Sequence, residues 1–208
     1  MKKDINISAL HPEDELEFSD DAGSVRIYHR RSDQEAVFII EAESKGSKVL
    51  LLPSKGLSIL QAYQDNRQIF WDPPLKSIPN SDGFDPFDEF FINGKKAIGS
   101  KWVRYFVGGV EMLGIDNWGM PYTDPESGRL LPLHGEASVT PIHQVEVLIE
   151  EDRIQVRGVI ELYDKGQVYG SPGPWYRVTK RVSLFPGSPE IRIHDSITNQ
   201  SSKTLFPD

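Results

Sequence analysis

Alternation of apolar and polar residues in the second half of the chain constrains the fold more than any other feature of the sequence. Apolar side chains recur at every second position over residues 145–149, and they return with the same period over 154–162. A period of two places side chains on one face of a β-strand, whereas an amphipathic helix needs a period near 3.6. Glu151 and Asp152 separate the two runs, so we predict that these runs form a hairpin.

A second pair of alternating runs, at residues 176–184 and 191–197, flanks the turn-forming dipeptide Pro186-Gly187 and predicts another hairpin. Earlier in the chain, Gly and Pro separate short runs rich in β-forming residues, at 25–28, 36–41, 48–52, 57–63 and 68–71. No window after residue 20 keeps an apolar helical period for three turns. The fold class predicted from these patterns is all-β, as a sandwich.

Composition and charge exclude several classes of protein. With 31 acidic and 23 basic residues the formal net charge is -8, so nucleic acid and anionic membranes are not expected as partners. The absence of cysteine excludes disulfides, thiolate catalysis and cysteine-rich zinc sites. The amino terminus has no apolar run of the kind found in signal peptides or membrane anchors, so we expect a cytoplasmic location. We expect one domain over residues 1–208, in which 1–24 form a poorly ordered or peripheral leader.

Residues suited to recognition are concentrated between positions 108 and 136. The segment 108–121 combines glycines with Asp116, Asn117 and Trp118. Acid and amide groups can hydrogen-bond sugar hydroxyls, and the flat face of tryptophan can stack on the C–H side of a sugar ring. In the alternative interpretation, Asp116 and Asn117 cap a turn and Trp118 fills the core.

A histidine follows this segment in the run Leu133-His134-Gly135-Glu136. Gly135 permits a tight turn or a close approach to a ligand, and Glu136 can orient the imidazole or accept hydroxyl hydrogens. Arg104 carries a planar guanidinium that can bind hydroxyls or carboxylates. For each of these residues an ordinary structural role is the alternative.

Other segments point away from cofactor chemistry. The chain has no phosphate-binding glycine loop, no histidine pair at metal-ligand spacing and no Gly-x-Ser-x-Gly elbow, so we expect neither a cofactor nor a metal. Residues 79–94 interleave acids with phenylalanines, which predicts an extension that packs on the sandwich with its acids in water. A lid over a functional site is the alternative for this segment.

Four blocks of sequence are together similar to a known family. They are VLLLPSKGLSI at 49–59, WVRYFVGG at 102–109, GIDNWGMP at 114–121 and LHGEAS at 133–138. In order and approximate spacing they resemble the DUF4432 branch of the aldose 1-epimerase, or galactose mutarotase-like, proteins. The resemblance implies a β-supersandwich with a sugar site on one concave sheet, and it implies that His134 contacts the substrate there.

The chain departs from the family pattern at several positions. Ser54 and Lys55 stand where the family commonly has an acid and an arginine, and Ser58 stands where it has an acid. Glu136 stands where the family often has an arginine. The exchange of a cation for Glu136 leaves the charge of the ligand open. The resemblance also places the family's general-acid histidine and general-base glutamate after Asp208. We therefore expect an incomplete portion of the supersandwich, whose open edges favour a homo-oligomer.

The residues and the resemblance together predict two alternative functions. The first is an isomerase that interconverts the anomers of an aldose or a related sugar by acid–base ring opening, and it needs no cofactor. The alternative is a non-catalytic sugar-binding or sensing domain. Whether the 208 residues are themselves an enzyme stays open, because the expected acid–base pair lies outside them. The candidate site residues are His134 as a catalytic residue, and Arg104, Asp116, Asn117, Trp118 and Glu136 as substrate-binding residues.

Overall fold

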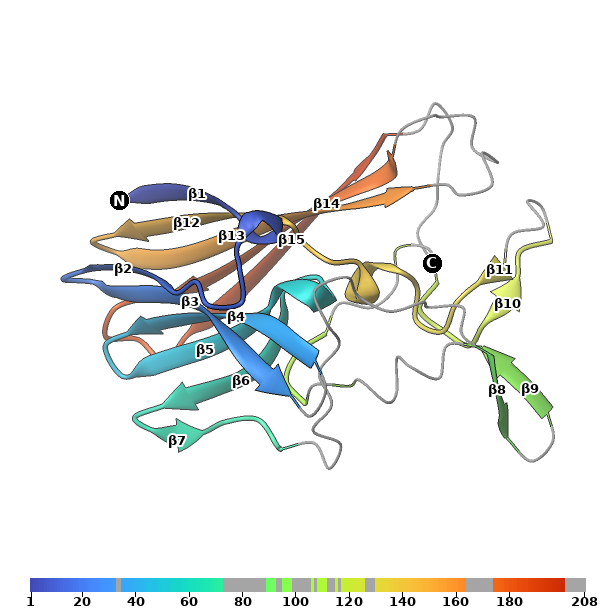
Figure 1. Ribbon diagram of the computed structural model, residues 1–208, viewed down its shortest axis with the longest axis horizontal. Coiled ribbons are helices and arrows are strands. Elements are labelled where there is room, and N and C mark those ends of the chain that lie inside the picture. Colours follow the sequence, from blue (N-terminus) through green and yellow to red (C-terminus); the bar gives the residue numbers. More distant parts are fainter. Residues whose placement is uncertain are drawn as a thin grey trace.

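Two antiparallel β-sheets form the body of the computed structural model, one above the other in Figure 1. The structure describes residues 1–32, 35–72, 89–92, 95–98, 106, 108–111, 115, 117–125, 130–163 and 174–200. Within these ranges the regular structure consists of strands and three short 3-10 turns, which confirms the predicted all-β fold.

The upper sheet has five strands in the order β1-β12-β13-β14-β15, and the lower sheet has six in the order β2-β3-β4-β5-β6-β7. The strands of the upper sheet are β1 (Lys2–Asn6), β12 (Gln144–Glu150), β13 (Arg153–Tyr163), β14 (Pro174–Leu184) and β15 (Ile191–Asn199). Those of the lower sheet are β2 (Leu16–Asp20), β3 (Gly23–Ser32), β4 (Glu35–Ser44), β5 (Ser47–Leu52), β6 (Ser58–Gln64) and β7 (Arg67–Gln68).

Smaller elements connect the sheets or extend from them. The 3-10 turns are η1 (Ile7–Ala9), η2 (Pro53–Lys55) and η3 (Ala137–Val139), and two further hairpins pair β8 (Glu89–Ile92) with β9 (Lys95–Ile98) and β10 (Tyr122–Thr123) with β11 (Leu130–Leu131). Of the phenylalanine-rich segment 79–94, only the backbone of β8 is described, so the predicted packing of this segment lies outside the described residues.

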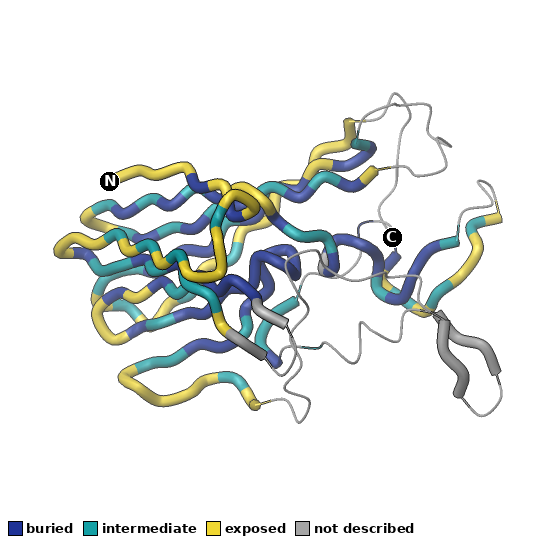
Figure 2. Tube along the Cα trace, viewed as in Figure 1, coloured by how far each residue is buried: buried dark blue, intermediate teal, exposed yellow. Residues whose placement is uncertain are grey.

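Both hairpins predicted from alternation are confirmed. β12 pairs with β13 in a register that sets Val147 opposite Val156, and β14 pairs with β15 with Val182 opposite Ile193. Burial alternates along β12 and β13 as the sequence pattern requires, because every second side chain points between the sheets. These inward rows form the main core, drawn in dark blue in Figure 2.

The amino-terminal residues belong to the two sheets, so the structure departs from the poorly ordered leader expected over residues 1–24, while the peripheral position that the expectation also allowed is kept. β1 pairs along its whole length with β12, and β2 pairs with β3. Both are edge strands, yet Ile5, Ile7 and Ala22 are buried in the main core. Backbone pairing and apolar burial therefore fix this region to the sandwich.

A lysine occupies the inward face of the upper sheet. Lys180 on β14 lies between the fully buried Val178 and Val182, and its own exposed fraction is 1%. Its Nζ lies 3.7 Å from a carboxylate oxygen of Asp195, whose side chain is 31% exposed. Burial lowers the pKa of Lys180 from the ordinary value of 10.5, and Asp195 opposes that shift.

Replacing Lys180 by methionine is expected to raise the free energy of unfolding at pH 7 by about 1 kcal/mol, because a buried charge is exchanged for an apolar chain of similar length. Between the lowered pKa of Lys180 and 10.5, the unfolded chain binds more protons than the folded chain, so wild-type stability rises with pH in that window. The variant should lose this contribution. Urea unfolding from pH 7 to 10.5 measures both effects.

The reverse change provides the control for Lys180. Replacing Asp195 by asparagine keeps Lys180 buried but removes the carboxylate that faces it, so this variant should be less stable than wild type. A Lys180→Met variant that loses more than about 2 kcal/mol would contradict the interpretation that the lysine is a net cost to the core.

Candidate functional site

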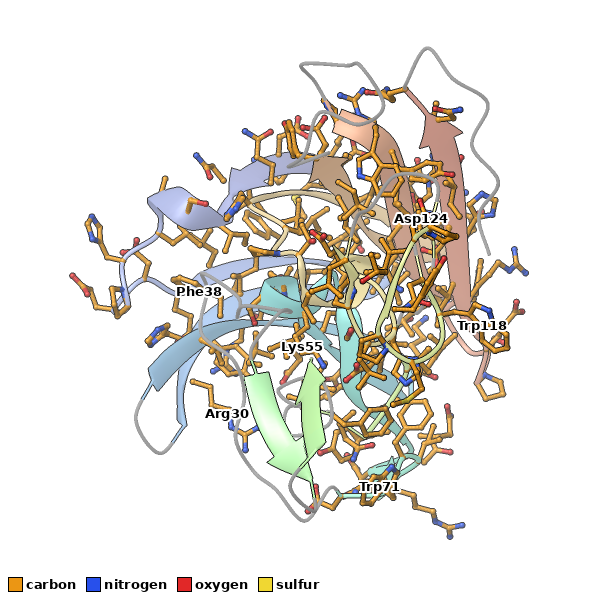
Figure 3. All side chains as sticks on the ribbon, turned by 90° about the vertical axis from the view of Figure 1, so that its right-hand side faces the viewer. Arg30, Phe38, Lys55, Trp71, Trp118 and Asp124 are labelled. Atoms are coloured by element: carbon orange, nitrogen blue, oxygen red, sulfur yellow. The ribbon has the colours of Figure 1, made fainter. Side chains whose placement is uncertain are left out.

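The described residues of the four sequence blocks meet at one end of the sandwich, the end that faces the viewer in Figure 3, where Lys55 lies near the centre and Trp118 to its right. Three groups of contacts bring them together. They join the η2 region to η3, the glycine-rich segment to β6, and the segment around Asn117 to the loop that holds His134. Residues far apart in the sequence thereby form one surface.

The first contact sets η2 against η3. Proline begins η2, where its missing N–H is not needed, and Gly56 ends it in the left-handed conformation with φ 57°. A Cβ atom at Gly56 would lie 2.7 Å from the carbonyl oxygen of Ala137, so only glycine lets the two turns approach this closely. The N–H of Ile142 also donates to the carbonyl of Pro53 at 2.9 Å.

The second contact docks the glycine-rich segment on β6. Ile59 and Val110 form an antiparallel bridge with two backbone hydrogen bonds, of 2.8 and 3.1 Å. One residue further along, Glu111 reaches Lys55 at the end of η2, with 2.5 Å between Nζ and Oε1. The two side chains are 0% and 2% exposed, so this ion pair is inside the protein. Burial lowers the pKa of Lys55, and Glu111 opposes the shift.

The third contact depends on the side chain of Asn117, which is 4% exposed. Its amide nitrogen donates to the carbonyls of Pro132 at 2.7 Å and Met120 at 3.0 Å, and its oxygen accepts from the N–H of Gly119 at 3.0 Å. Both polar atoms are thus engaged within the protein. The structure therefore gives Asn117 a positioning role, and its predicted contact with sugar hydroxyls stays a prediction.

His134 lies directly against this segment. Its backbone N–H donates to the carbonyl of Gly119 at 3.0 Å, and its ring atom Nδ1 lies 2.5 Å from the carbonyl oxygen of Trp118. A carbonyl can only accept, so this contact places a proton on Nδ1. In the neutral imidazole the lone pair is then on Nε2, the nitrogen able to accept a proton or a hydroxyl hydrogen.

The side chain of Trp118 is 64% exposed, and that of Met120 is 73% exposed. Trp118 therefore does not fill the core, which overturns that part of the alternative interpretation, whereas Asn117 does accept a hydrogen bond across its own turn. Because the carbonyl of the same residue fixes the histidine ring, an exposed indole and an oriented imidazole belong to one local structure.

The remaining predicted site residues have different outcomes. Glu136 is buried, with an exposed fraction of 7%, and its carbonyl accepts from Val139 N–H and Thr140 Oγ1 as η3 begins. Its predicted contact with a substrate stays a prediction. Arg104 and Asp116 lie outside the described residues, so their roles stay predictions as well.

Backbone strain gathers in the same blocks. Left-handed φ angles occur at Leu57 (57°) and Ile115 (81°), whose side chains disfavour that conformation, and at His134 (58°), a residue type that adopts it more readily. By contrast, Asp65 and Asn66, with φ 48° and 63°, form the two-residue turn between β6 and β7, where such angles are normal. Strained angles of this kind are often found at functional sites, because surrounding contacts must hold them.

Sequence reasoning missed the ion pair between Lys55 and Glu111. The available signal was a lysine inside an otherwise apolar run and a glutamate directly after Gly108-Gly109-Val110. Among the described residues, no group of three or more His, Asp or Glu side chains is placed to hold a metal ion. The described part of the chain also has no helix long and apolar enough to cross a membrane.

Comparison with known proteins defines first a class and then a family. In fold, the chain is similar to a crystal structure, at 1.90 Å resolution, of a candidate aldose 1-epimerase from Klebsiella pneumoniae subsp. pneumoniae MGH 78578, with a TM-score of 0.68 and 22% identity. The match covers 97% of this chain and 52% of that one, so the chain spans about half the length of this relative. The fold is thus an aldose 1-epimerase-like β-sandwich.

The family follows from the sequence match. A family described as a domain of unknown function, DUF4432, matches residues 34–205, and the chain belongs to this family. The resemblance predicted from the four blocks is therefore confirmed. No curated protein shows significant similarity to the chain.

Proposed function

We propose that the end of the sandwich formed by the four blocks binds a sugar, and that the protein acts in an isomerase of the aldose 1-epimerase type. The observation that carries the proposal is the contact between His134 Nδ1 and the carbonyl of Trp118. It fixes an imidazole of defined tautomer against the backbone of a residue whose indole is exposed, and these two ring types suit a hydroxylated ring with apolar C–H faces.

The proposed chemistry is the exchange of anomers. A base removes the proton from the anomeric hydroxyl while an acid protonates the ring oxygen; the C1–C2 bond of the opened sugar rotates, and closure yields the other anomer. In this scheme Nε2 of His134 orients the sugar or assists proton transfer, and Trp118 stacks on the ring. Asn117 positions both residues through its hydrogen bonds to their chain neighbours Gly119 and Pro132. Arg104, Asp116 and Glu136 are proposed to bind hydroxyls.

A histidine variant tests the site. Replacing His134 by asparagine is expected to weaken monosaccharide binding about tenfold, equivalent to about 1.4 kcal/mol. Isothermal titration with a panel of aldoses measures affinity, and polarimetry of freshly dissolved α-anomers measures mutarotation. His11, an exposed loop residue far from these contacts in the sequence, gives the matched control His11→Asn, which should behave as wild type.

The outcomes separate the two functions. Faster mutarotation with wild type than with buffer, reduced in His134→Asn, supports the isomerase. Saturable binding without faster mutarotation supports the second candidate, a sugar-binding domain without turnover. No binding of any sugar by wild type would overturn both. Self-association and a cytoplasmic location are part of the proposal as well.

A further inference from the structure

We propose that the outer face of the five-stranded sheet carries a second binding site, which takes a small polyhydroxylated anion and holds it by Arg157. This face is turned away from the core. Along β13 the even-numbered residues are buried, and Arg157, Val159 and Glu161 point outward. The site is independent of the proposed sugar site, because none of the residues that form the contacts around His134 lines it.

The strand register explains why this face is hollow. Val159 lies opposite Thr179 on β14, and both have short side chains. Two positions away on either side, long side chains face each other: Arg157 opposite Arg181, and Glu161 opposite Arg177. Short residues between two rows of long ones leave a depression in the middle of the sheet.

The depression is large enough for a small metabolite. It encloses about 700 Å³, and an adjoining hollow of about 320 Å³ shares Gln144, Arg157 and Val159 with it. Ligand sites usually measure about 300–1,000 Å³. Because Arg157 lines both hollows, it lies where they adjoin.

Of the two arginines that line the groove, Arg157 has the weaker compensation, although the carboxylates of Asp4 and Glu146 also line the adjoining hollow. Arg177 donates to one oxygen of Glu161 from Nε at 3.1 Å and from an Nη at 2.5 Å, while Tyr163 donates to the other oxygen at 2.9 Å. These hydrogen bonds lower the pKa of Glu161, and the one from Arg177 has the largest effect. Glu161 therefore stays ionised, and its negative charge offsets the positive charge of Arg177.

Glu146 compensates Arg157 only in part. The carboxylate of Glu146 lies 2.6 Å from Lys2 Nζ but 3.6 Å from the guanidinium of Arg157, which is beyond hydrogen-bond range. Planar guanidinium groups bind carboxylate and phosphate through paired hydrogen bonds. In a chain of net charge -8, such a cation provides a local site for an anion.

The remaining lining favours a hydroxylated ligand over an apolar one. Polar groups of Thr140, Gln144 and Thr179 surround the floor; Gln144 and Thr179 can both donate and accept hydrogen bonds, whereas the Thr140 hydroxyl donates to Glu136 and can still accept. A sugar acid has the matching chemistry, with a carboxylate for Arg157 and hydroxyls for these groups. A sugar phosphate has the same chemistry with a different anion.

The test is isothermal titration at low salt with D-gluconate and D-glucose 6-phosphate, and with uncharged sorbitol for comparison. Arg157→Gln should weaken binding of the anions at least about tenfold. Arg153→Gln is the matched control, because Arg153 is on the same face of β13, is paired with Glu150 at 2.7 Å and lines neither hollow. Val159→Phe, which fills the floor and keeps every charge, should also prevent binding. Thermal unfolding of each variant verifies that it is folded.

The outcomes are distinct. Binding of gluconate alone identifies a carboxylate site, and binding of both anions identifies a site for the shared anionic chemistry; sorbitol should not bind here. The His134→Asn variant should bind the anions as wild type does, whatever becomes of the proposed sugar site. Absence of anion binding, or equal losses in Arg157→Gln and Arg153→Gln, would overturn the proposal.

Discussion

Replacing Lys55 by methionine is expected to lower the free energy of unfolding by about 3–5 kcal/mol, the usual cost of removing one partner of a buried ion pair. The carboxylate of Glu111 is 2% exposed and lies 2.5 Å from Lys55 Nζ. Without the ammonium group, this carboxylate would stay in the interior and lose the cation that lies closest to its Oε1. Denaturant unfolding followed by tryptophan fluorescence measures the change.

A surface ion pair on the neighbouring strand provides the control for Lys55. Lys48 on β5 lies 2.7 Å from Glu43 and its side chain is 32% exposed, so Lys48→Met should change stability by less than about 1 kcal/mol. The double variant Lys55→Met, Glu111→Leu should regain most of the lost stability, because it removes both charges. Equal losses for Lys55→Met and Lys48→Met would contradict a buried pair.

The strands of this fold could be predicted because their signal is local. The alternation over 145–162 and 176–197 is a direct consequence of side chains pointing to opposite faces, and both hairpins follow from it. β1 gave no such signal. It has five residues with one buried side chain, Ile5, and its partner β12 begins only at Gln144. A pairing across that distance depends on the folded sheet rather than on the segment itself.

The candidate site could be predicted only in part, for a similar reason. The residue types around Trp118 and His134 indicated recognition chemistry, and the order of four blocks indicated a shared surface. Which residues face a ligand depends on tertiary contacts. Asn117 carries the groups of a sugar-binding residue, but its three strongest hydrogen bonds all hold the loop. The ion pair of Lys55 and Glu111 joins residues 56 positions apart; the lysine inside an apolar run indicates a buried cation, but no local pattern identifies its partner.

Replacing Gly109 by valine is expected to abolish sugar binding at the proposed site and to lower the free energy of unfolding by about 3 kcal/mol. A Cβ atom at Gly109 would lie 1.9 Å from the carbonyl oxygen of Ile59 and 2.8 Å from its carbonyl carbon. Ile59 is 1% exposed within the main core, so β6 cannot move away. The glycine-rich segment must shift instead.

That shift would act on the site through two contacts. It would break the backbone bridge between Ile59 and Val110, and it would draw Glu111 away from Lys55. Gly119→Ala is the matched control, because the nearest atom to its added Cβ is 3.8 Å away, which is an ordinary contact. Titration calorimetry and denaturant unfolding of both variants measure the effects. If Gly109→Val bound sugar as tightly as Gly119→Ala, the close approach of the glycine-rich segment to β6 would have no part in forming the site, and His134 and Trp118 would have to be positioned by Asn117 alone.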